Sequence, residues 1–336
     1  MKTLLSLLLL SLVMLGDEVK IASYNVENLF DMHYSGSEYA EYIPNTSWQW
    51  NQKNYRIKLK NIAKVIADIK PDIIALQEIE SKKALRDLQA EIQRAGHYLP
   101  YLAITHKKTN IKVALLSKMP LHAKDLFVSH APRERNILEA KVQLGNESLY
   151  LFVNHWKAKS GPESRRMLSA KALKKRLNTL GNVNYVVLGD LNSDYREYET
   201  FVKKRKLNDT QGRTGINHIL QTIDGGQPIT LTSLKENKSY SYNLWYELPK
   251  KERYSHIYRG IGEGLDHIII SPALANNRGV EYQKQSFHTF KAPYLFHKNK
   301  IYRWQRSRTH PKHHIGKGYS DHLPIYATFS YTNRFN

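Results

Sequence analysis

The sequence predicts an α/β sandwich, in which β-sheets pack on one another and helices cover the outside. Three observations predict it. Short β-type runs are frequent, and several are almost continuously apolar, which suits strands buried on both faces. Only two clear helical patterns lie between them. Residues 17–336 contain no repeat, low-complexity tract or long Pro/Gly/Ser linker, so we expect one continuous domain.

Eight segments read as strands, because each is four to eight residues long, rich in β-branched residues and bounded by turn-forming or polar residues. They are residues 19–26, 72–79, 111–117, 137–144, 148–155, 183–188, 265–271 and 323–329.

Two segments carry apolar residues at helical spacing. Residues 55–69 place Ile57, Ile62, Val65, Ile66 and Ile69 on one stripe, and Pro71 ends the pattern. Residues 162–180 carry a second apolar stripe and a basic opposite face. We therefore expect two helices packed on the sheets.

The N-terminus has the pattern of a secretory signal. Met1, Lys2 and Thr3 precede an apolar run over residues 4–15, and Gly16 and Asp17 follow it. Twelve residues are too few to span a bilayer comfortably. We expect residues 1–16 to be a signal peptide and the catalytic domain to occupy 17–336. An uncleaved anchor is the alternative, because residues 14–16 lack the small-x-small cleavage pattern.

The chain of 336 residues is strongly basic. Lys and Arg number 51 against 30 Asp and Glu, a formal net charge of +21, which attracts polyanions such as nucleic acid or anionic lipid. Its 41% hydrophobic content excludes a disordered, collagen-like or polytopic membrane protein. There is no cysteine, so any chemistry uses oxygen and nitrogen groups, and the fold needs no disulfide.

Polar residues recur where the predicted strands begin or end. They are Asn25, Glu78, His155, Asp190, Asn192, Asp266, His267, Asp321 and His322. Carboxylate and amide oxygens of this kind are the ligands that Mg²⁺ or Mn²⁺ prefers.

Each of these residues also has a purely structural interpretation. Asn25 alone is typical of a turn or cap, and His155 alone of a satisfied core histidine. Asp190 and Asn192 are two apart, so both side chains leave an extended segment on the same face and can grip a phosphate or a metal. Asp266 and His322 form either a structural ion pair or a carboxylate that orients a general base.

Six segments, in this order, resemble the endonuclease/exonuclease/phosphatase superfamily, the deoxyribonuclease I-like proteins. They are residues 23–30 (SYNVENLF), 72–78 (DIIALQE), 154–156 (NHW), 189–192 (GDLN), 265–267 (LDH) and 319–324 (YSDHLP). The resemblance implies a four-layered α/β sandwich with two central, mainly antiparallel sheets flanked by helices. Two further patterns are similar to bacterial exported endonucleases within that superfamily: residues 154–157 with Glu163 and Arg166, and residues 244–249 followed by residues 253–255.

The resemblance also implies roles. Glu78 would hold a divalent cation, Mg²⁺ or Mn²⁺ with Ca²⁺ as a further candidate, and Asn25 and Asp321 would complete its shell. Asp190 and Asn192 would position the attacking water and the phosphate. His322, oriented by Asp266, would be the general base or a phosphate ligand. His155 would stabilise the transition state or protonate the leaving oxygen.

Charge distribution indicates the substrate. Residues 282–320 contain no Asp or Glu, but they contain nine Lys or Arg residues interleaved with rings that include Trp304, which are the ingredients of a nucleic-acid groove. The alternative is a solvated basic surface whose rings pack into the core. We expect Arg135, Asn154, Lys157, Arg166 and Trp304 to contact substrate.

These patterns predict an exported, metal-dependent nuclease that cleaves DNA or RNA with little sequence preference, in the periplasm or secreted. Nucleic acid is its expected partner, with no stable protein partner and no membrane insertion after signal removal. A phospholipid or inositol phosphodiesterase, such as a sphingomyelinase, is the first alternative. An inert DNA-binding protein is the second.

Overall fold

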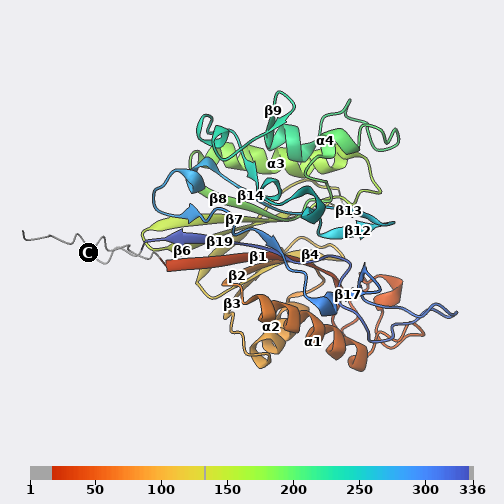
Figure 1. Cartoon of the computed structure of the whole chain (residues 1–336). Helices are drawn as coiled ribbons and strands as arrows, with labels where there is room; N and C mark the ends of the chain where they lie inside the picture. Colours follow the sequence, from red (N-terminus) through yellow and green to blue (C-terminus); the bar gives the residue numbers. More distant parts are fainter. Residues whose placement is uncertain (1–16, 132–133, 333–336) are drawn as a thin grey trace, which may run out of the picture.

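The computed structural model describes residues 17–131 and 134–332; the predicted signal peptide lies outside them. Two large sheets face one another, as Figure 1 shows. The first has the order β15-β19-β1-β2-β4-β3, with β16 also on β19, and the second the order β11-β14-β8-β7-β6-β5. Only β1–β2 and β7–β8 are parallel among the pairs of these sheets.

The strands of the first sheet are β1 (Asp17–Leu29), β2 (Ile73–Ile79), β3 (Tyr101–Ile104), β4 (Lys112–Ser117), β15 (Glu281–Tyr282), β16 (His288–Thr289) and β19 (Ile325–Tyr331). Those of the second sheet are β5 (Leu121–Leu126), β6 (Ile137–Leu144), β7 (Glu147–His155), β8 (Asn184–Asp190), β11 (Tyr242–Asn243) and β14 (Asp266–Ile270). Three small hairpins complete the strands: β9 (Ile223–Asp224) with β10 (Gln227–Pro228), β12 (His256–Tyr258) with β13 (Ile261–Glu263), and β17 (Phe296–His297) with β18 (Lys300–Ile301).

Helices cover both outer faces. The helices α1 (Gln52–Ile69) and α2 (Lys82–Arg94) lie on the first sheet, and α3 (Glu163–Leu180) lies on the second (Figure 1). Shorter turns are α4 (Glu197–Thr200), η1 (Ala40–Tyr42), η2 (Gly215–Ile219), η3 (Ser233–Lys235), η4 (Leu244–Glu247), η5 (Lys250–Glu252), η6 (Pro272–Ala275) and η7 (Pro293–Leu295). No helix among the described residues combines the length and the apolar character needed to cross a membrane.

Three apolar cores separate the four layers. Val19, Leu151 and Ile268 belong to the core between the sheets, which the strands reach through their alternating side chains. Ile62 of α1 and Leu88 of α2 bury the outer face of the first sheet. A third core lies under α3. The predicted four-layered sandwich is therefore confirmed.

The eight predicted strands correspond to β1, β2, β4, β6, β7, β8, β14 and β19, and the two predicted helices to α1 and α3. The helix α2 is not among the predicted elements, although its buried residues Ala84, Leu85, Leu88 and Ile92 have helical spacing and Ser81 caps its first turn. Nor are the short hairpins, whose strands are too short to show a pattern.

Candidate active site

A row of three functional side chains is set by strand register in the second sheet. At the end of the parallel pair β7–β8, His155 lies opposite Asp190, and in the antiparallel pair β8–β14, Asp190 lies opposite Asp266. Because neighbouring strands lie about 4.8 Å apart, the register brings these residues side by side. The three positions are far apart in sequence, but they are adjacent where these three neighbouring strands begin or end, at one end of the sheet.

Two bulges bring residues of the first sheet to the same place. The register between β1 and β2 shifts after Asn25, where Glu27 and Asn28 have positive φ angles of 52° and 61°. The register between β2 and β4 shifts at Glu78, which has a φ of 67°. Bulges re-aim side chains, and here they mark the point at which both strands meet the site.

Asn25 joins the two sheets. Its side-chain amide donates to Glu78 Oε1 at 3.2 Å and to Asp190 Oδ2 at 3.0 Å, and its own Oδ1 accepts from the backbone N–H of Glu27. His155 Nε2 lies 3.7 Å from Glu78 Oε1 and 3.5 Å from Asp190 Oδ2. One amide and one imidazole thus face the same pair of carboxylates.

His322 is held from three directions. Its Nδ1 lies 2.7 Å from Asp266 Oδ2, and its backbone N–H donates to Ser320 Oγ, which in turn donates to the carbonyl oxygen of Asn25. Its backbone forms a bridge with His256 of β12, and the two rings lie 4.8 Å apart. His256 is not among the predicted site residues, although it directly follows residues 253–255, which carry part of the resemblance.

The two central histidines have opposite charge preferences. Burial, together with Arg135 and His322, lowers the pKa of His155 well below its usual value. Burial also opposes charge on His322, but the carboxylates of Asp266, Asp190 and Asp321 outweigh it and raise its pKa well above the usual value. At neutral pH the site therefore holds one neutral imidazole and one imidazolium.

The carboxylates fit a small divalent cation. Burial and repulsion by Asp321 raise the pKa of Glu78, and burial raises the pKa of Asp190 to about 7. A cation would relieve this cost, and these oxygens are the hard ligands that Mg²⁺ and Mn²⁺ take. Asp266 Oδ1 is buried without a hydrogen-bond partner. Among the described residues, His256, Asp321 and His322 form one group with mutually close ligand atoms, and Asp190, Asp266 and His322 form another.

The remaining predicted residues lie around this centre. Asn192 donates from its backbone to Asp190 Oδ1 at 2.8 Å and from its side chain to the carbonyl of Trp156. Asp321 forms an ion pair with Arg303 at 3.2 Å, and the same guanidinium binds the buried Glu27. Glu27 and Arg303 are not among the predicted site residues, because their pairing joins positions 276 residues apart in sequence.

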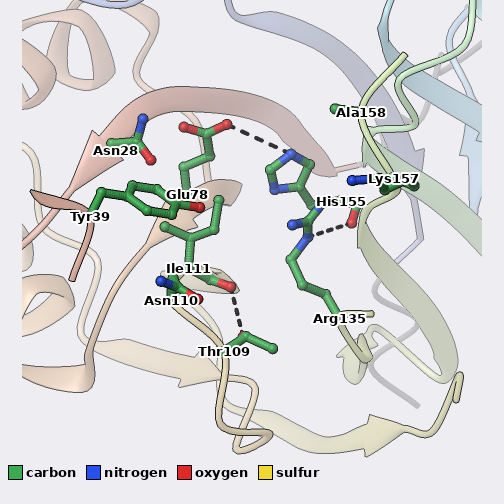
Figure 2. A pocket seen from close by; sticks show the side chains of 10 residues that line it. All are labelled: Asn28, Tyr39, Glu78, Thr109, Asn110, Ile111, Arg135, His155, Lys157 and Ala158. Atoms are coloured by element: carbon green, nitrogen blue, oxygen red, sulfur yellow. Dashed lines mark hydrogen bonds and ion pairs between the residues drawn. The ribbon is translucent and has the colours of Figure 1, made fainter. Parts of the chain in front are cut away.

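A cavity of about 560 Å³ opens beside Glu78 and His155. Figure 2 shows both side chains pointing toward one another at its edge, with Tyr39 and Asn28 on one side and Arg135 and Lys157 on the other. Arg135 donates to the backbone carbonyls of His155 and Trp156, which fixes it beside the histidine. Arg135 and Lys157 are thus placed where an anionic substrate would enter.

Three predicted substrate contacts are wrong. Asn154 and Arg166 are fully buried: Asn154 bonds the backbone of Phe152 and the Trp156 ring, while Arg166 pairs with Glu163 at 2.6 Å. Trp304 is buried and donates to His314 Nδ1. The polar groups of these three buried side chains bind internal partners, so these residues are structural.

The predicted ring-lined groove of residues 282–320 is also corrected. Phe287 and Trp304 are buried, and Phe290, Tyr294 and Phe296 pack against the core under the first sheet. Exposed cations do remain in this segment, among them Lys298, Lys300, Arg306, Arg308 and Lys312. Most Lys and Arg side chains of this segment are exposed as expected, but most of its aromatic rings are buried in the core or pack against it.

Comparisons with known proteins identify the family and the fold. A family model described as "Endonuclease/Exonuclease/phosphatase family" matches residues 20–226 and 207–330. Among curated proteins, no relative matches the chain.

Solved structures share the fold at low identity. TDP2 from Caenorhabditis elegans superposes with a TM-score of 0.55 at 15% identity, covering 94% of this chain and 74% of that one. An AP endonuclease from Archaeoglobus fulgidus gives 0.53 at 16% identity, covering 92% and 98%. D. rerio TDP2, solved with a single-strand DNA product, gives 0.55 at 14% identity, covering 93% and 99%.

Proposed function

The chain belongs to the endonuclease/exonuclease/phosphatase family, whose members are metal-dependent phosphodiesterases and nucleases, and on this premise we propose that it is an exported, divalent-metal-dependent nuclease. Its substrate is DNA, cleaved with little sequence preference. Export is supported by the signal-like pattern of residues 1–16.

One observation carries the hydrolytic assignment. A neutral histidine, His155, and a charged one, His322, flank the buried carboxylate of Asp190, which Asn25 ties to Glu78. Neighbouring buried groups whose pKa values are shifted in opposite directions are typical of acid–base catalysis.

The residues divide the work of hydrolysis between them. Asp190, with a pKa raised to about 7, takes a proton from water as the water oxygen bonds to phosphorus. The bond to the leaving oxygen breaks, and that oxygen keeps the bonding electron pair and takes up a proton from solvent. The imidazolium of His322, held by Asp266, offsets the charge that grows on the phosphate oxygens, and neutral His155 donates a hydrogen bond to them. A cation held by Glu78, with Asp321 near it, would add Lewis-acid stabilisation of the same charge.

The charge of the chain supports DNA as the substrate. With a formal net charge of +21, the protein attracts a polyanion over long range, and phosphate contacts alone give no sequence preference. The D. rerio relative of the same fold was solved with single-strand DNA, which agrees with this choice.

Plasmid nicking tests the proposal. The chain from Asp17 onward is incubated with supercoiled DNA and Mg²⁺ or Mn²⁺, with a chelator control and with Asp190→Ala. We expect nicking that both controls abolish. An intact plasmid, together with hydrolysis of RNA or release of phospholipid headgroups, would reject DNA as the substrate. Full nicking by a folded Asp190→Ala variant would reject the site.

A further inference from the structure

The hairpin formed by β12 and β13 rises directly from the active site. Its first residue, His256, is bridged to His322, and the Leu323 backbone N–H donates to the carbonyl of Ser255 at 2.7 Å. The hairpin ends in a two-residue turn at Arg259 and Gly260, with φ angles of 50° and 84°. Two positive φ values are the geometry of a tight turn that matches strand twist, so the hairpin has a defined shape.

Strand register gives this hairpin one face toward the site. His256 lies opposite Glu263, and Tyr258 lies opposite Ile261. Directly paired residues share a face, and so do residues two apart, so all four side chains project from the same side. Since the His256 ring lies against His322, Tyr258 and Ile261 extend that wall outward by about 7 Å.

Both tip residues are exposed without apolar cover. Tyr258 is 57% exposed and Ile261 68%. The guanidinium of Arg259 lies 5.3 Å from the centroid of the Tyr258 ring. At the base, Lys159 fixes Glu263 at 2.7 Å. The base of the hairpin is thus anchored, while its tip presents a ring, an aliphatic chain and a cation to solvent.

A second hairpin that carries cations lies beside β12. The strand β12 packs beside β18, whose hairpin carries exposed Lys298 and Lys300. Among the large apolar side chains described on these two hairpins, only Tyr258 and Ile261 are mainly exposed. Two apolar groups among cations make a small platform for one base and its flanking phosphates, and too small an apolar area for insertion into a bilayer.

We propose that the β12–β13 hairpin is the strand-binding platform of the enzyme: Tyr258 stacks on an unpaired base next to the scissile phosphate, Ile261 supports it, and Arg259 meets a neighbouring phosphate. This inference rests on the proposed function and names the element that recognises its substrate. It also relocates the predicted stacking surface, because the rings of residues 282–320 are largely occupied in the core.

Kinetics on two substrates test the platform. Base stacking on an aromatic residue is worth about 1–3 kcal/mol, so Tyr258→Ala should raise KM for a single-stranded oligonucleotide roughly 5- to 150-fold with little change in kcat. Hydrolysis of bis(p-nitrophenyl) phosphate, which has no base, should be unchanged. Tyr258→Phe keeps the ring and should restore KM. Tyr98→Ala is the matched control, because Tyr98 is 59% exposed and follows His97, whose Nε2 lies 2.7 Å from the carbonyl oxygen of Pro71, at the opposite end of β2 from Glu78.

A binding assay separates failure of this inference from failure of the proposed function. A fluorescent oligonucleotide is titrated into Asp190→Ala with and without Tyr258→Ala. Weaker binding by the double variant supports the platform even if wild-type cleavage is slow. Equal binding, or an unchanged KM, overturns the platform and leaves the nuclease intact. If the wild type cleaves no DNA and Asp190→Ala binds none, both the platform and the proposed nuclease function are rejected. If the protein instead binds anionic phosphatidylserine vesicles and Tyr258→Ala abolishes that binding, the hairpin recognises lipid.

Discussion

At the scale of single residues, the two histidines of the site, His155 and His322, differ in charge because their surroundings differ. His155 Nε2 lies 3.5 Å from Asp190 Oδ2, and Arg135 lies beside it. His322 Nδ1, in contrast, lies 2.7 Å from Asp266 Oδ2. His155 Nδ1 is also buried without a partner. The same imidazole is therefore neutral at one position and charged at the other, and the difference depends on a few specific contacts.

Removing the carboxylate that orients His322 should change the pH profile. The Asp266→Asn variant keeps the shape of residue 266 but loses its charge, so the pKa of His322 should fall. The imidazolium exists below that pKa, so the alkaline limb of kcat/KM should move to lower pH. We expect kcat to fall roughly 10²-fold as well. Hydrolysis of bis(p-nitrophenyl) phosphate from pH 5 to 10 measures both effects.

Asp224→Asn controls for the loss of a carboxylate in general, because Asp224 is exposed and lies in the β9–β10 hairpin. It should leave the profile unchanged. An Asp266→Asn profile that superposes on the wild type would show that the ion pair is only structural.

At the scale of elements, strand register explains most of what the sequence made predictable. Long apolar runs identified β7, β8 and β14, and polar residues at their ends identified Asp190 and Asp266. The bulges at Glu27 and Glu78 and the contacts made by His256 were not predictable, because they depend on pairing between segments distant in sequence. Burial of Arg166 and Trp304 was missed for a related reason: a basic or aromatic residue looks the same in sequence whether it pairs internally or faces a substrate.

The close approach of β7 and β8 depends on Gly189. Its φ is 120°, and a Cβ there would lie 2.1 Å from the carbonyl oxygen of Asn154. Gly189→Ala should therefore force the two strands apart next to His155 and Asp190. We expect a loss of at least about 2 kcal/mol in unfolding free energy and a large loss of activity.

Gly225→Ala is the matched control, because Gly225 also has a positive φ, 51°, but a Cβ there would meet no atom within 4 Å. It should cost about 1 kcal/mol and leave activity intact. Urea unfolding and single-turnover hydrolysis measure both variants. Equal losses for the two would mean that backbone conformation alone, and not the strand contact, makes Gly189 necessary.

At the scale of the whole molecule, net charge and buried histidines govern the response to solution conditions. The excess of cations is spread over the surface, while the groups of the candidate active site are buried at one end of the sandwich. Salt should consequently weaken substrate binding, whereas acid should change the stability of the fold through its buried histidines. The two responses can therefore be measured separately.

Salt should weaken DNA binding steeply. If about four phosphates are contacted, the dissociation constant for duplex DNA should rise on the order of 10²-fold between 50 and 200 mM salt. The KM for bis(p-nitrophenyl) phosphate, which carries one charge, should change little over that range. A flat salt dependence for DNA would show that the +21 charge serves something other than substrate binding.

Acid should destabilise the fold through histidines that are locked in neutral form. His267 Nδ1 accepts from Asn243 while Nε2 faces the Ser193 carbonyl at 2.8 Å, and His314 Nδ1 accepts from Trp304. Burial lowers the pKa of each to about 4, below the ordinary 6.5 of the unfolded chain. At these two positions the unfolded state therefore binds more protons between these values, so the contribution of the two histidines to stability falls as pH decreases from 6.5 to 4.

Linkage sets the size of this acid effect at roughly 2 kcal/mol per histidine by pH 5, measured as the urea unfolding free energy relative to pH 7. His267→Gln keeps a donor and an acceptor but does not titrate, so its stability should fall by about 2 kcal/mol less than that of the wild type over the same interval. His122→Gln, at an exposed position, should follow the wild type. If His267→Gln also loses stability in parallel with the wild type, the acid sensitivity arises elsewhere, because a side chain that cannot bind a proton cannot contribute to a proton-linked transition.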